Sequence, residues 1–164
     1  MYPSELGFMM PAEWERHRQT FMEWPLKEAE WPGPFQEILS GFTNIAKKIA
    51  AFEQVTVITS PASTKEAAVY LYDTPTPNPI QLLEIEHNDS WIRDNGPTFV
   101  VNPQKEIAGI NWKFNAWGGK YRFTEDDQVA PELLAHLKIP KFDAPLVLEG
   151  GSIHVDGDGT LLTT

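Results

Sequence analysis

The part of the sequence that most constrains the fold is a long amphipathic pattern followed at once by a β-branched run. Between residues 34 and 52, apolar side chains recur every three or four positions, which predicts one buried face of an α-helix. Residues 54–59 (QVTVIT) then predict a strand. A second helix is expected from Ser60-Pro61 to Tyr72, with the serine as its cap. Helices that alternate with strands predict an α/β chain.

The rest of the chain continues this alternation. The patterns predict strands at 80–86, 98–101, 106–114 and 145–148, a helix at 128–137 capped by Asp126 or Asp127, and a last hairpin formed by 152–156 and 159–163. A hairpin turn is expected to join the second and third of these strands.

Composition excludes several classes of protein. The 164 residues suffice for one domain, and the net charge of −10 argues against a nucleic-acid binder. The absence of cysteine excludes disulfides, thiolate metal sites and a thiol nucleophile within these residues. We recognise neither a secretory signal nor an apolar run long enough for a membrane helix, so a cytoplasmic location is expected. Because the sequence stops in a strand-like run at Thr164, it reads as though it were cut in mid-structure.

The densest polar cluster is residues 88–97 (NDSWIRDNGP), which connects two predicted strands. In one interpretation it is a structural loop in which Arg93 pairs with Asp89 or Asp94. In the other it grips a cation, because Trp91 offers a π-face and Asp94 a planar pair of acceptors that suit a guanidinium.

A second cluster lies at residues 148–156 (LEGGSIHVD), where Glu149 precedes two glycines. The glutamate is either a turn residue or a site residue, and the glycines permit a sharp turn or a close approach. His154 and Asp156 are expected on one face of a strand, as an exposed pair, an acid–base pair or metal ligands with Glu149. With only four histidines in the chain, an exposed strand face is favoured over a metal site.

Aromatic residues gather in a third cluster, residues 111–121 (NWKFNAWGGKY), which breaks at two glycines. The aromatic rings either belong to the core or form a wall beside a site.

Four motifs in order carry a family resemblance. They are MPAEWERH at 10–17 with EWP at 23–25, NDSWIRDNGPT at 88–98, FNAWGGK at 114–120 and LEGGSIHVDG at 148–157. With these motifs the chain resembles the agmatine deiminases, which belong to the guanidino-group-modifying (pentein) superfamily together with bacterial-type peptidylarginine deiminases and arginine deiminase.

The resemblance implies a fivefold pseudosymmetric α/β propeller built of ββαβ blades. It implies hydrolysis of agmatine, a small cationic guanidino substrate, to N-carbamoylputrescine and ammonia, with no metal or organic cofactor. Asp94 and Glu149 would then bind the guanidinium, and Trp91 would line the substrate channel. Peptidylarginine or free arginine remains an alternative substrate, and a non-catalytic guanidine- or polyamine-binding module is an alternative function.

The sequence departs from the family pattern in its catalytic residues. The family's cysteine nucleophile is absent, and its catalytic His-x-Asp motif follows the Glu-Gly-Gly motif by some tens of residues, so His154 and Asp156 do not correspond to it. Both are expected beyond Thr164, because a family member is about twice this length. Residues 1–164 are therefore expected to be the N-terminal part of one deiminase domain, inactive alone, that associates with the missing half or forms homo-oligomers.

Overall fold

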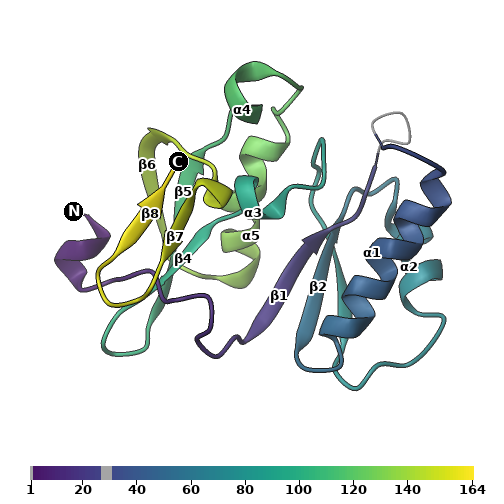
Figure 1. The fold of residues 1–164 in the computed structure, drawn as a ribbon, viewed down its shortest axis with the longest axis horizontal. Helices are drawn as coiled ribbons and strands as arrows, with labels where there is room; N and C mark the ends of the chain where they lie inside the picture. The colour runs from purple at the N-terminus through teal and green to yellow at the C-terminus, as the bar shows by residue number, and fades with distance from the viewer. Residues whose placement is uncertain (1, 27–30) are drawn as a thin grey trace. The chain divides into compact units, whose positions relative to one another are not determined.

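The computed structural model describes residues 2–26 and 31–164, which belong to two compact units (Figure 1). The central unit is Arg16–Ile92, and the terminal unit combines Met1–Glu15 with Arg93–Thr164.

The central unit is a parallel three-stranded sheet with two helices on one face (Figure 1). Its strands are β1 (Gln19–Glu23), β2 (Gln54–Thr59) and β3 (Ile80–Glu84), in that order, and its helices are α1 (Phe35–Ile49) and α2 (Thr64–Leu71). Alternate residues of β2, Val55 and Val57, point into a core shared with Trp24, Leu39, Ala46, Ala50, Ala67, Leu71 and Ile80.

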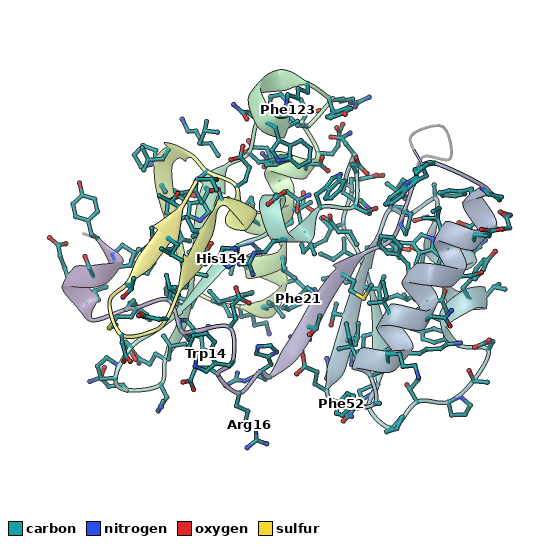
Figure 2. All side chains as sticks on the ribbon, in the orientation of Figure 1. Trp14, Arg16, Phe21, Phe52, Phe123 and His154 are labelled. Carbon is teal, nitrogen blue, oxygen red and sulfur yellow. The ribbon has the colours of Figure 1, made fainter. Side chains whose placement is uncertain are left out.

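Several boundaries in this unit differ from their prediction, and β3 ends at Glu84, two residues before its predicted end. Strand 54–59 is confirmed, but α1 ends at Ile49, and Phe52 is 87% exposed and points away from the ribbon (Figure 2). Helix α2 begins at Thr64 because Ser60 and Pro61 belong to a turn, in which the Ser60 carbonyl accepts the N–H groups of Ser63 and Thr64 at 3.0 and 3.1 Å. Ser60 is therefore not the helix cap.

The terminal unit contains a second three-stranded sheet and a small hairpin. Strand β4 (Thr98–Val101) pairs antiparallel with β5 (Ile107–Lys113), as predicted, and β5 pairs parallel with β6 (Lys141–Val147). The hairpin consists of β7 (Ile153–Val155) and β8 (Leu161–Thr163). The helical elements are η1 (Pro3–Leu6), α3 (Ile92–Asn95, which begins in the central unit), α4 (Ala116–Gly119), α5 (Asp126–Leu137) and η3 (Gly150–Ser152).

Helix α5 connects β5 to β6 and begins at Asp126 after the cap position Glu125. Neither predicted aspartate is thus the cap. Asp127 instead accepts the N–H of Phe114 at 2.8 Å, which ties the start of the helix to the end of β5. Buried Leu133 and Leu134 form part of the apolar face that packs on the sheet.

The mixed α/β class is confirmed, and the described residues form three separate sheets of three, three and two strands. Within residues 2–26 and 31–164, every helix falls short of the length and apolarity that crossing a bilayer requires.

Candidate functional site

Asp94 is held by the backbone of the second polar cluster. It lies in the single turn α3, and its Oδ1 accepts the N–H of Gly151 at 2.8 Å. Across the residues that the structure describes, this is the one hydrogen bond of the Asp94 carboxylate, so Oδ2 remains available to a ligand.

The two glycines explain how closely the segments approach. A Cβ on Gly150 would lie 2.1 Å from the Arg93 carbonyl oxygen, and one on Gly151 would lie 2.4 Å from Asp94 Oδ1. Both distances are far inside van der Waals contact. A larger residue at position 150 would push the two main chains apart, and one at position 151 would displace the Asp94 carboxylate. The close approach, rather than a positive φ, therefore explains the glycines.

Glu149 immediately precedes this contact, in extended backbone at φ −93° and ψ 132°. Its carbonyl accepts the N–H and hydroxyl of Ser152 at 2.9 and 2.7 Å, which fixes the turn. Its side chain is half-buried, and among residues 2–26 and 31–164 its carboxylate has no hydrogen-bond or ion-pair partner. The structure thus brings the segments of Asp94 and Glu149 together. Within the described residues, Asp94 Oδ2 and both carboxylate oxygens of Glu149 accept no hydrogen bond.

Arg93 has other partners than the sequence suggested. The structural alternative paired it with Asp89 or Asp94, but its Nη2 lies 2.6 Å from Glu13 Oε1. Nε donates to the Gly150 carbonyl at 3.2 Å, and Nη2 also donates to the Ile153 carbonyl at 3.4 Å. The arginine is therefore not the ion-pair partner of Asp94.

Trp91 belongs to the central unit, whereas Asp94 and Glu149 belong to the terminal unit. Its Nε1 donates to Asp89 Oδ2 at 2.8 Å, and 45% of its surface is exposed. A place for Trp91 along the substrate channel stays a prediction.

His154 and Asp156 do not form the predicted pair on a strand. His154 is exposed on β7 (Figure 2), which ends at Val155, so Asp156 lies in the hairpin turn. There Asp156 Oδ1 accepts the N–H groups of Asp158 and Thr160 at 2.8 and 3.0 Å. Hydrogen bonds from the Thr160 hydroxyl, and then from the Asp158 and Thr160 N–H groups, lower the pKa of Asp156. In the described part of the chain no group of three His, Asp or Glu residues is placed to hold a metal, so the metal-site alternative gains no support.

The aromatic cluster contains a left-handed turn. Ala116 and Trp117 have φ values of 49° and 54°, and Gly118 and Gly119 follow at 86° and 78°. The Trp117 ring meets Phe114 and Tyr121 edge-on, at centroid distances of 5.5 and 6.1 Å. Phe114 is buried and Tyr121 is 54% exposed, so the cluster extends from the core to the surface.

Sequence reasoning assigned no role to Glu13 and none to His87. Glu13 lies in the 10–17 motif and pairs with Arg93. His87 is 4% exposed, with Nδ1 3.0 Å from the Ile85 carbonyl oxygen and Nε2 3.1 Å from that of Trp24, so it anchors the start of the 88–97 cluster. The signal for His87 was its position beside this cluster, whereas nothing in the sequence pointed from Glu13 to Arg93.

The mixed α/β fold places the Asp94 carboxylate against the N–H of Gly151, in the glycine pair that Glu149 directly precedes. Residues 9–164 match the family model of the Porphyromonas-type peptidyl-arginine deiminases, and the chain belongs to this family.

Similar proteins carry a more specific name. Agmatine deiminase of Ectopseudomonas mendocina is 45% identical over 99% of this chain and 45% of its own length. The solved agmatine deiminase of Enterococcus faecalis is 36% identical, with a TM-score of 0.90 over 98% of this chain and 44% of that one. A cysteine-to-serine variant of the C. jejuni agmatine deiminase, with substrate bound, is 26% identical, with a TM-score of 0.83 over 95% of this chain and 45% of that one. The chain spans less than half the length of these relatives.

Proposed function

We propose that this chain is the guanidinium-binding part of an agmatine deiminase, which hydrolyses agmatine to N-carbamoylputrescine and ammonia. The observation that carries the proposal is the contact of Asp94 with Gly151, because it seats one carboxylate beside the turn that bears the other, Glu149. Trp91 is proposed to line the path of the substrate.

The physical role of the two carboxylates follows from the substrate. A guanidinium carbon is a poor electrophile because resonance spreads its positive charge, so the site must hold the plane of the cation steady for attack. One carboxylate about 4 Å away contributes on the order of 4 kcal/mol at an effective dielectric of 20. Two carboxylates also fix the orientation of the plane through paired hydrogen bonds.

The covalent steps need groups that these residues do not include. We assign the attack on the guanidinium carbon to a cysteine thiolate and proton transfer to a His-x-Asp pair, both outside this sequence, which contains no cysteine. Ammonia leaves first, and water then releases the ureido product from the thiouronium intermediate. The bound substrate in the cysteine-to-serine C. jejuni variant supports this division.

The proposed whole fold is a pentein propeller, of which residues 1–164 form the N-terminal part. The order β4-β5-α5-β6, antiparallel and then parallel, agrees with a ββαβ blade. We further propose a cytoplasmic protein of putrescine biosynthesis, whose chain pairs with a C-terminal half or with a second copy. Peptidyl or free arginine is the alternative substrate, and binding without catalysis is the alternative function.

Calorimetry with agmatine tests the proposed site. Asp94→Asn keeps an acceptor for the Gly151 N–H but removes the charge, and Glu149→Gln does the same for the second carboxylate. Each is expected to weaken binding about tenfold or more, since a hydrogen bond to a charged group contributes about 1.5–3 kcal/mol. Glu132→Gln, on the exposed side of α5, is the matched control and should bind as the parent does.

Two outcomes would contradict parts of the proposal. A parent chain that does not bind agmatine contradicts the site. Ammonia release from agmatine by the isolated 164 residues, above a buffer blank, contradicts the assignment of the chemistry to absent residues.

A further inference from the structure

We propose that Arg93 is a positioning residue, which Glu13 orients and which holds the Glu149 turn against Asp94. The inference rests on the proposed function for its consequence, agmatine binding, but its structural content can be tested without any ligand.

The first observation is how Arg93 uses its donors. Nε reaches the Gly150 carbonyl at 3.2 Å, and Nη2 reaches the Ile153 carbonyl at 3.4 Å. These two carbonyls belong to the first residue of the turn η3, which directly follows Glu149, and to Ile153, the residue after the turn. One rigid guanidinium therefore holds the turn at both ends, which the single ammonium of a lysine cannot reproduce.

The second observation is the backbone of the same residue. The Arg93 carbonyl packs so closely on Gly150 that a Cβ there would lie 2.1 Å from its oxygen. The next residue, Asp94, accepts the Gly151 N–H at 2.8 Å. Arg93 thus meets the turn through its side chain and its main chain, while its neighbour supplies the carboxylate.

The third observation is the position of Glu13. Its Oε1 lies 2.6 Å from Arg93 Nη2, the nitrogen that also reaches Ile153. Both side chains are about half exposed, at 47% and 46%, and ion pairs as exposed as this contribute little to global stability. Removal of the pair should therefore disturb the local turn far more than the fold.

Amide exchange at Gly151 measures this directly, because its N–H is the hydrogen bond between the turn and Asp94. Exchange is measured by NMR on the full 164-residue chain. Asp94→Ala removes the acceptor and gives the rate of the unbonded amide. Arg93→Gln is expected to raise the rate at least tenfold toward that limit. Glu13→Gln should raise it less, and Arg93→Lys should fall between Arg93→Gln and the parent.

Arg122→Gln is the matched control. Arg122 forms an exposed ion pair with Glu125 three residues away, and it takes no part in the turn. It should leave the Gly151 rate at the parent value. Arg93→Gln, Arg93→Lys, Glu13→Gln and Arg122→Gln should all melt within a few degrees of the parent. If Arg93→Gln does not fold, Arg93→Lys and Glu13→Gln test the proposal.

Agmatine and putrescine then separate positioning from general charge. Putrescine lacks the guanidinium, so it cannot form the paired hydrogen bonds that two positioned carboxylates offer to a guanidinium. Arg93→Gln should weaken agmatine binding about tenfold and putrescine binding little, so that the preference for agmatine falls. A Gly151 rate unchanged in Arg93→Gln and Glu13→Gln overturns the positioning role, whatever the parent binds. If the parent does not bind agmatine but Arg93→Gln raises the exchange rate of the Gly151 amide, the proposed function is contradicted and the positioning role of Arg93 is supported.

Discussion

At the scale of single residues, the candidate site depends on the absence of a side chain at position 151. Gly151 does not have a positive φ, so the backbone itself accepts alanine. The added Cβ would nevertheless lie 2.4 Å from Asp94 Oδ1, and the carboxylate would have to move or lose its hydrogen bond.

We therefore expect Gly151→Ala to weaken agmatine binding about tenfold, which corresponds to about 1.4 kcal/mol. The measurement is calorimetric titration, with thermal melting beside it. Gly41→Ala is the control, because that helical glycine has nothing within 4 Å of the added Cβ. It should leave binding unchanged and stabilise α1 by about 0.5–1 kcal/mol. Equal affinity in Gly151→Ala and the parent would show that this contact does not shape the site.

The site could be predicted from the sequence only as far as local chemistry reaches. Asp94 and Glu149 stood out because carboxylates lay beside an arginine or a glycine pair. The structure shows that their segments meet through the Gly151 N–H, and their role in binding stays a prediction. The pairing of Arg93 with Glu13 could not be predicted, because eighty residues separate them and nearer carboxylates offered equally good partners. His154 and Asp156 failed as a pair because a turn that begins at Asp156 takes its side chain into local hydrogen bonds.

At the scale of elements, one contact between helix α5 and strand β5 in the terminal unit is unusually close. Gly109 of β5 faces Leu134 of α5 so closely that a Cβ would lie 2.3 and 2.7 Å from the two methyl carbons of the leucine. Leu134 is 1% exposed, so its side chain is enclosed by other atoms of a closely packed core.

Gly109→Ala should therefore destabilise the chain by about 1–3 kcal/mol through overpacking. Leu134→Ala alone should cost about 2–5 kcal/mol by leaving a cavity. In the double variant the alanine methyl group enters the space the leucine vacates, so the combined loss should be smaller than the sum of the two. Denaturant unfolding of the three variants measures this, and strictly additive losses would mean that the two residues do not share one space.

Elements with a strong internal pattern were predictable, and elements defined by their partners were not. Strands β2 and β4 have the predicted bounds, because β-branched and apolar runs specify them locally. Strand β1 mixes polar and apolar residues, and it is a strand because it pairs in register with β2. Strand β6 begins at Lys141, four residues before its predicted start, because pairing with β5 extends it over a polar segment.

At the scale of the whole molecule, acidic side chains should make the stability of the fold decrease as the pH falls. Three aspartates have a pKa below the ordinary value of 3.8. Hydrogen bonds from Lys47 and then Thr74 cause the shift at Asp73, and bonds from Lys141 and then Asn111 cause it at Asp143. Bonds from Thr160 and then Asp158 lower the pKa of Asp156.

A carboxyl group whose pKa is lower in the folded than in the unfolded chain stabilises the fold above the unfolded pKa. This contribution disappears as pH falls through the folded pKa, because protonation then favours the unfolded chain. All three shifts act in this direction, so stability should be constant from about pH 6 to pH 5 and fall below about pH 4. The net charge of −10 at pH 7 also becomes positive in that range, which adds repulsion among the 13 lysines and arginines.

Melting curves between pH 6 and pH 2.5 measure the decline, and Asp143→Asn assigns part of it. Asp143 accepts hydrogen bonds from the ammonium of Lys141, on the same strand, at 2.6 Å and from the amide of Asn111 at 2.8 Å, and the Asn111 bond joins β6 to β5. Asparagine has no proton to gain, so the variant should start less stable at pH 6 and lose less on acidification. Glu132→Gln removes a carboxylate that takes part in none of these bonds and should follow the parent curve. If Asp143→Asn and the parent lose the same stability between pH 5 and pH 2.5, the lowered pKa of Asp143 does not contribute, and the decline comes from the global charge.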